Sequence, residues 1–197
     1  MQRDLETLEP ANAASRDQRI LAAATKLFAE RGFAGVGVDA LAAESGITGS
    51  AVYRHFASKD EILSTLFDRL IDSLLVRLGD VLPDAHAELD RLIGLHVEYV
   101  LANPELTTIW QREQSTLTGI YRRSFLRRQR LYVDRWVSAL DACYPGHDRD
   151  HLATTVRAVH GLISSDTSRP STSKQVPDLG EHLTAMTRAA CAVLSAP

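Results

Sequence analysis

The sequence predicts an all-α protein, in which a small N-terminal unit of three helices is joined by a long fourth helix to a larger helical bundle. Apolar residues recur at steps of three and four along nearly the whole chain, and the alternation typical of strands is nearly absent. Prolines and glycines fall between the periodic stretches. The 197 residues are 45% hydrophobic and 24% charged, which provides apolar material for one or two domains.

The first three predicted helices are short. Residues 16–31 carry one apolar face and end at Gly32, a typical C-terminal signal. A helix over residues 38–45 is broken by Gly46, and another fits residues 49–56.

The fourth helix is long because its apolar stripe runs unbroken from Ile62 to Leu78. Ser58, with Glu61 three residues on, predicts a capping box at its start, and Pro83 is the expected stop. The remaining helices, separated by proline and glycine, are expected at about residues 85–101, 105–113, 119–143, 149–164 and 178–194. Residues 165–177, rich in Ser, Thr and Pro, predict an exposed loop.

Residues 38–56 have the pattern of a helix-turn-helix. Gly46 suits a turn that other residues resist, and the small Ala42 permits the two helices to approach closely. The second helix concentrates side-chain donors: Thr48, Ser50, Tyr53, Arg54 and His55, with Lys59 opening the next helix. Residues 16–60 nevertheless hold six basic and five acidic residues, so a structural helix-turn-helix that binds no DNA stays an alternative.

The same region resembles the tetracycline-repressor (TetR) family of bacterial transcriptional regulators. The resemblance is carried by residues 19–33, Val38, Leu41-Ala42, Gly46-Ile-Thr, residues 52–56 and residues 58–63. It implies a dimer that reads a palindromic operator, usually to repress, and releases it when a small molecule binds the C-terminal bundle. By position, Thr48, Tyr53, His55 and Lys59 match DNA-contacting sites of the family.

One departure concerns the residues before the second helix. The family commonly has Thr or Ser there, where this chain has Val36 and Gly37, so a hydroxyl cap is missing although glycine is tolerated. The candidate DNA-contacting residues are Gly37, Thr48, Gly49, Ser50, Ala51, Tyr53, Arg54, His55 and Lys59. The expected organisation is a flexible arm over residues 1–15, a DNA-binding domain over 16–60 and a ligand-binding and dimerisation domain over 61–197.

Polar residues interrupt two apolar faces of the bundle. His96 does so on one helix and Arg128 on another, and buried polar groups must be paired or hydrated. One interpretation is a mostly apolar ligand pocket, with the candidate residues His96, Tyr99, Trp110, Tyr121, Phe125, Arg128 and Tyr132. The alternative pairs Arg128 with an acid such as Glu98 or Glu113 and leaves His96 a satisfied core histidine.

An arginine run lies on the long 119–143 helix. Its members are Arg122, Arg123, Arg127, Arg128 and Arg130. The run either attracts an anionic ligand, such as an acyl-coenzyme A thioester, or forms a solvated helix face.

The last two helices, about 149–164 and 178–194, are expected to form a homodimer interface. Their apolar stripes are Leu152, Val156, Val159 and Ile163 on one helix, and Leu179, Leu183, Met186, Ala190 and Val193 on the other. Small residues, Ala185, Ala189 and Ala192, flank the second stripe. The alternative is that both stripes close the core of a single chain.

Several function classes are disfavoured. The chain has no Gly-rich phosphate loop, no His–Glu metal spacing and no nucleophile elbow, so we expect neither an enzyme nor a cofactor. A small helical enzyme and a helical adaptor that no longer binds DNA stay as rival interpretations. His147 and His151, with Asp148 and Asp150 nearby, allow a metal site but fit a capping cluster better, so no metal is expected.

Location and redox chemistry are inferred from what the sequence contains. The net charge is −3, no stretch approaches the ~20 apolar residues of a membrane span, and residues 1–16 have no apolar signal core, so we expect a cytoplasmic protein. Cys143 and Cys191 lack paired spacing and are expected to be reduced thiols, with a redox-sensing pair as the alternative.

Overall fold

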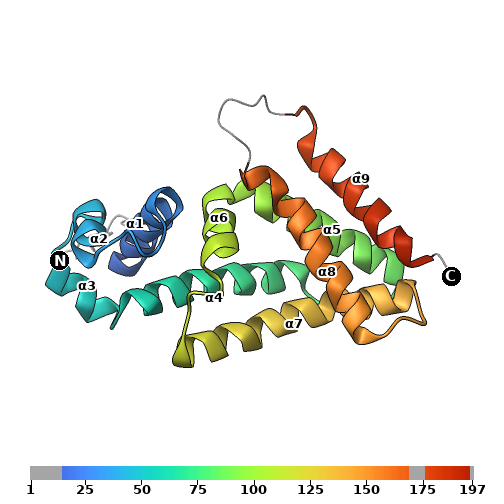
Figure 1. The fold of residues 1–197 in the computed structure, drawn as a ribbon, viewed down its shortest axis with the longest axis horizontal. Helices are drawn as coiled ribbons and strands as arrows, with labels where there is room; N and C mark the ends of the chain where they lie inside the picture. The colour runs from blue at the N-terminus through green and yellow to red at the C-terminus, as the bar shows by residue number, and fades with distance from the viewer. Residues whose placement is uncertain (1–14, 169–175, 196–197) are drawn as a thin grey trace, which may run out of the picture.

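The computed structural model describes residues 15–168 and 176–195, and this part of the chain is helical with no strand (Figure 1). The arm expected over residues 1–15 lies, apart from Ser15, outside the described residues, as do residues 169–175 of the expected loop. The α-helices are α1 (Arg16–Arg31), α2 (Val38–Ser45), α3 (Gly49–His55), α4 (Lys59–Leu78), α5 (Ala85–Ala102), α6 (Pro104–Glu113), α7 (Gly119–Cys143), α8 (Arg149–Ser164) and α9 (Leu179–Ala192). Short 3-10 helices, η1 (Ser165–Ser168) and η2 (Val193–Ser195), follow α8 and α9.

Local signals set most helix ends. Ser58 caps α4 by accepting the Glu61 N–H at 3.1 Å, as the sequence predicts. The expected stop of α4 at Pro83 is wrong, because the chain leaves the helix at Gly79, whose φ of 58° ends the helical turn. Pro104 stands at the start of α6, where its missing N–H costs nothing.

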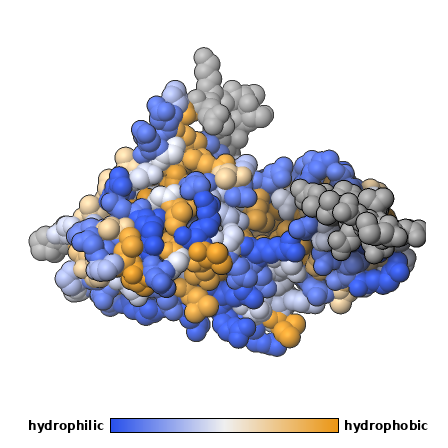
Figure 2. Space-filling view, turned by 180° about the vertical axis from the view of Figure 1, so that it is seen from behind, coloured by the Kyte–Doolittle hydropathy of each residue, from blue (hydrophilic) through white to orange (hydrophobic). Residues whose placement is uncertain are grey.

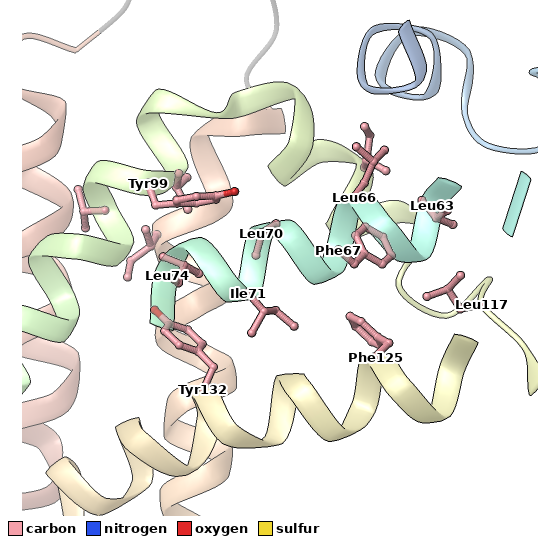
Figure 3. Packing of buried hydrophobic residues seen from close by; sticks show 14 of the residues in the cluster. Leu63, Leu66, Phe67, Leu70, Ile71, Leu74, Tyr99, Leu117, Phe125 and Tyr132 are labelled. Atoms are coloured by element: carbon pink, nitrogen blue, oxygen red, sulfur yellow. The ribbon is translucent and has the colours of Figure 1, made fainter. Parts of the chain in front are cut away.

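Helix α4 connects the two parts of the molecule. Helices α1 to α3 cluster at one end, and α4 runs from them alongside α7 into the bundle of α5, α8 and α9 (Figure 1). Its stripe from Ile62 to Leu78 is buried apart from the partly buried Leu75. Phe67 packs against Phe125 of α7, which Figure 3 shows, and against Trp110 of α6, at ring-centre distances of 5.4 and 5.2 Å. A movement of α4 relative to α6 or α7 therefore has to repack this aromatic cluster.

The stripes of α8 and α9 mostly close the core of one chain. The α8 stripe is at most 1% exposed, and Leu179 and Leu183 are also buried, so the expectation that these residues face a partner is wrong. Met186 and Val193, by contrast, are 43% and 68% exposed. The outer faces of the two helices carry small exposed residues: Ala158, Gly161, Ala185, Ala189 and Ala192.

Hydrophobic surface also appears elsewhere on the bundle. Figure 2 shows orange patches set among hydrophilic surface on the side of the molecule that holds the bundle. Of the helices in the described residues, none combines the length and apolar character that a membrane crossing needs.

Candidate functional site

Helices α2 and α3 form the predicted helix-turn-helix. Gly46 adopts the left-handed conformation (φ 67°, ψ 35°), and its N–H donates to the carbonyls of α2. The Ile47 N–H donates to the Ala42 carbonyl at 3.0 Å, and Leu41 and Val52 are almost fully buried between the helices. The turn therefore fixes α3 against α2 and leaves the other face of α3 outside.

The outer face of α3 carries free polar groups. Tyr53 is 58% exposed, Arg54 and Ser50 are exposed, and neither Tyr53 nor Arg54 forms a hydrogen bond or ion pair within the described residues. Thr48 caps the helix by accepting the Ala51 N–H at 3.2 Å. Ala51 itself is only 8% exposed, so its methyl group lies against the protein and not on the open face.

Two predicted DNA-contacting residues are engaged within the chain. His55 Nδ1 lies 2.5 Å from Asp17 Oδ1 of α1. The Lys59 ammonium donates to the carbonyls of Phe33 and Val36 at 2.7 and 2.9 Å and stands 4.2 Å from the centre of the Phe33 ring. Lys59 thus joins the segment after α1 to the start of α4. These two hydrogen bonds leave one of the three ammonium N–H groups for another acceptor.

The two candidate glycines differ in their surroundings. Gly37 is exposed, precedes α2 without a side-chain cap, and has open space where a Cβ would stand. A Cβ added at Gly49 would lie 3.4 Å from Asp39 Oδ1 of α2.

Helix α6 joins the bundle to the N-terminal unit through hydrogen bonds. The Glu113 carboxylate accepts the Phe33 N–H and the Thr116 hydroxyl, both at 2.9 Å. The neighbouring Arg112 donates to the Ala29 carbonyl at 3.1 Å. These contacts hold the C-terminal end of α1 to α6, which sequence reasoning did not predict because the partners are about 80 residues apart.

A cavity of about 300 Å³ lies among α4, α5, α6, α7 and α8. Four of the seven predicted ligand residues line it: His96, Tyr99, Trp110 and Tyr132. Figure 3 shows Tyr99 and Tyr132 on opposite sides of α4, flanking Leu74. The other apolar lining comes from Leu70, Ile71, Leu74, Val100, Val133 and Val156.

Sequence reasoning missed other residues of the cavity. These are Thr107, Gln111, Gln114, Gln129, Arg157, His160, Gly161 and Ser164. His160 follows Val156 by four residues, so its place on the inward stripe of α8 was a signal that helical spacing offered.

The polar part of the cavity is a cluster of His96, Tyr132 and His160. The Tyr132 hydroxyl is 2.8 Å from His96 Nδ1, and the two imidazoles stack with centres 4.2 Å apart. Burial lowers the pKa of His96 to about 4. Burial, and then the neighbouring His96, lower the pKa of His160 well below its ordinary value, so both rings are neutral near pH 7.

Three predicted ligand residues lie outside the cavity lining. Phe125 packs in the core against Trp110 and Phe67, and Tyr121 lies half-buried against that core. Arg128 is paired, but with Asp68 and Asp72 of α4 and not with Glu98 or Glu113; its Nε is 3.2 Å from Asp68 Oδ1. Burial raises the pKa of Asp68, although the Arg128 guanidinium opposes that shift.

The rest of the arginine run faces water. Its other members, Arg122, Arg123, Arg127 and Arg130, are exposed and absent from the cavity lining. This arrangement is that of a solvated helix face.

The remaining candidate groups are structural in character. His147 Nε2 lies 2.9 Å from the Leu194 carbonyl oxygen, and Asp148 caps α8 by accepting the His151 N–H at 2.8 Å. Across residues 15–168 and 176–195 there is no group of three or more His, Cys, Asp or Glu side chains that could hold a metal ion. Cys143 and Cys191 are both free thiols.

Comparison with known proteins agrees with this geometry. Residues 20–66, from α1 into α4, match the family model described as bacterial regulatory proteins, tetR family. The HTH-type transcriptional repressor KstR2 of Mycobacterium tuberculosis (strain CDC 1551 / Oshkosh) is 31% identical over 131 residues, which cover 64% of this chain and 66% of the relative's length. The chain belongs to the tetR family of bacterial regulatory proteins.

Solved structures extend the likeness of this tetR-family chain to its whole fold. The ketosteroid transcriptional regulator KstR2 of Mycobacterium tuberculosis aligns with a TM-score of 0.75 at 20% identity, covering 92% of this chain and 96% of that one. AibR, solved in complex with isovaleryl coenzyme A and operator DNA, aligns with a TM-score of 0.74 at 20% identity, covering 87% of this chain and 97% of its own. At these identities the likeness concerns the fold alone.

Proposed function

We propose that this chain is a ligand-responsive, dimeric transcriptional regulator that represses by binding a palindromic operator. It releases the operator when a small, mostly apolar or acyl-type molecule enters the cavity among α4 to α8. The observation that carries the proposal is the exposed face of α3, where Tyr53 and Arg54 have no partner within the described residues. Unpaired donors on the second helix of a helix-turn-helix suit contact with a DNA groove.

The proposed DNA contacts differ in kind. Arg54 and Ser50 would reach base edges, and Tyr53 would donate to a phosphate. Thr48 caps α3 and Gly49 is its first residue, and both would lie beside the sugar-phosphate backbone, with Gly37 directly before α2. His55 and Lys59 are held by Asp17 and by the Phe33 and Val36 carbonyls, so they contribute only the N–H groups left over. Buried Ala51 supports α3 from within.

Helix α6 supplies the proposed connection between ligand and DNA. The cavity is lined by Trp110, Gln111 and Gln114. The intervening residues Arg112 and Glu113 hydrogen-bond to the C-terminal end of α1 and to Phe33 just after it. A ligand that packs against Trp110, Gln111 and Gln114 would shift α6. Arg112 and Glu113 would move with the helix, and so would the N-terminal unit that carries α3. The ligand would thereby change how often the two helix-turn-helix units of the dimer have the spacing that the operator requires.

The dimer is proposed to form through the outer faces of α8 and α9. Small exposed residues there, with the exposed Met186 and Val193, allow a second pair of helices to approach closely. Two helix-turn-helix units are needed to reach half-sites about 34–36 Å apart. The acyl-type ligand is supported by AibR, the structural neighbour described with isovaleryl coenzyme A and operator DNA.

The test is DNA binding by the purified full chain, measured by fluorescence anisotropy on the DNA upstream of its own coding region. Arg54→Ala should weaken binding by about 1–3 kcal/mol, the value of a good base contact. Arg130→Ala, an exposed arginine on α7, is the matched control and should leave binding unchanged. Equal affinity of the Arg54→Ala and native proteins would refute the proposed reading face.

A second measurement tests the dimer. Ala189→Arg places a charge on the outer face of α9 and should shift the sedimenting species from dimer to monomer. Ala22→Arg, the same change at an exposed alanine of α1 and away from α8 and α9, is the control in the same experiment. A native protein that sediments as a monomer at micromolar concentration contradicts the dimer.

A further inference from the structure

The inner end of the cavity is built from aromatic rings of three helices. His96 of α5 and Tyr132 of α7 share a hydrogen bond of 2.8 Å, and His160 of α8 stacks on His96 at an interplanar angle of 9°. The Trp136 and His160 rings are nearly perpendicular, with an interplanar angle of 83° and ring centres 4.8 Å apart. The rings hold one another in place, so His160 cannot easily turn away from the cavity that it lines.

Two buried nitrogens of these rings, Trp136 Nε1 and His160 Nε2, lack a hydrogen bond within the described residues, and of the two residues only His160 lines the cavity. His160 Nε2 is buried and forms no hydrogen bond within the described part of the chain. Leaving a buried polar atom without a hydrogen bond costs free energy, because the atom loses its contact with water and gains nothing in return. A ligand atom that hydrogen-bonds to this nitrogen recovers that cost, whereas a wholly apolar ligand does not.

The charges around the cavity exclude an ionic group at this end. None of the described residues that line the cavity is Asp or Glu, so an ammonium group would find no counter-ion. Arg157, the one arginine among the described residues of the lining, is exposed and donates to the Thr154 hydroxyl on its own helix. Because His96 and His160 are neutral, a carboxylate beside them would also be buried without an opposite charge.

We propose that the inner end of the cavity binds the uncharged, oxygen-bearing end of a compact apolar ligand through a hydrogen bond to His160 Nε2. A neutral imidazole accepts from a hydroxyl in one tautomer and donates to a carbonyl in the other, so both oxygens fit. The ligand is a free alcohol or ketone, or an acyl thioester whose carbonyl enters with its chain. The volume of about 300 Å³ fits a small ligand or the acyl part of a larger one. This inference rests on the proposed function, since it specifies the effector of that same cavity.

The test compares probes that share one straight eight-carbon chain and differ in the end group. Isothermal titration calorimetry near neutral pH, on the full chain without DNA, measures the alcohol, the methyl ketone, the carboxylate, the amine and the coenzyme A thioester. The alcohol and the ketone should bind at least about tenfold more tightly than the carboxylate and the amine. Thioester binding as tight as that of the alcohol assigns the ligand to acyl thioesters, and weaker binding assigns it to free neutral molecules.

Two results overturn the inference: a carboxylate or amine that binds as tightly as the alcohol, or no binding by any of the five probes. His160→Phe keeps a stacked ring but removes the nitrogen, and should weaken alcohol binding about tenfold, the value of one hydrogen bond. His151→Phe, the same change on the exposed side of α8, should leave binding unchanged.

A measurement on the native chain covers the case in which the variant does not fold. The imidazole nitrogen resonance of His160, followed by NMR, should move when the alcohol is added, and an unmoved resonance overturns the hydrogen bond. Because no DNA is present, these results are separate from the regulator proposal. If the chain prefers the alcohol but binds no operator, the inference about the cavity stands and the proposed function is refuted.

Discussion

Replacing Lys59 by methionine tests a role that the structure gives to a predicted DNA contact. The ammonium group makes two hydrogen bonds, to the Phe33 and Val36 carbonyls, and one cation–π contact with the Phe33 ring. Hydrogen bonds from a charged donor contribute about 1.5–3 kcal/mol each, but this site is half-exposed, and water can replace part of them. We therefore expect Lys59→Met to lower the free energy of unfolding by about 2 kcal/mol. For a chain of this length that loss corresponds to a fall in Tm of about 4–8 °C.

The assay combines thermal unfolding with a salt titration of DNA binding. Lys26→Met is the matched control, because Lys26 is an exposed lysine whose ion pair within the described residues is with Glu44, and its loss should change Tm less. The reasoning is refuted if Lys59→Met leaves Tm unchanged while the slope of log affinity against log salt falls by about 1. That result would mean that Lys59 neutralises a phosphate and that its contacts with the two carbonyls stabilise nothing.

Further predictions concern the turn, the α6 contact, acid stability and a thiol. Gly46→Ala should cost about 1–2 kcal/mol in urea unfolding because φ is 67°, and it should abolish operator binding; native-like stability would contradict the strain. Glu113→Ala removes the 2.9 Å contact to the N-terminal unit and should weaken ligand-triggered operator release, measured by anisotropy, more than operator affinity; an unchanged response would exclude this route. The pKa of His96 falls from 6.5 to about 4 on folding, so below pH 6.5 the unfolded state gains protons that the folded state does not. As the pH falls below 6.5, the free energy of unfolding should therefore decrease by up to about 1.4 kcal/mol per pH unit for His96, and His160 should act in the same direction. The variant His160→Phe should make the free energy of unfolding depend less steeply on pH. Burial raises the pKa of Cys191 to about 11, so iodoacetamide near pH 7 should alkylate it far more slowly than an exposed thiol; mass spectrometry showing rapid modification would contradict this.

The fold was largely predictable because each helix carries its own boundaries. The expected ranges for α1, α2, α7 and α8 agree with the structure, since capping residues and glycines act within a few positions of the helix that they end. The error at the end of α4 has the same origin. Gly79 already meets the requirement for a left-handed residue, so the chain turns there before Pro83 can act.

The candidate site was predictable only in part. Helical spacing placed His96 and Tyr132 on inward faces, and both line the cavity. The same spacing placed Arg128 there, yet it reaches Asp68 and Asp72, because a long side chain takes the acid that the neighbouring helix α4 offers. His160 was missed because its stripe was assigned to a partner chain, and in the structure that stripe packs inward.

The sequence by itself determined the features that depend on near neighbours: the helices, the turn at Gly46 and the open face of α3. Periodicity, capping and backbone conformation are local properties, so they can be predicted from the order of the residues. Only the tertiary structure decided which distant groups meet. It brought His96, Tyr132 and His160 together and tied Glu113 to the end of α1, because those contacts depend on how the helices pack and not on the order of residues along any one of them.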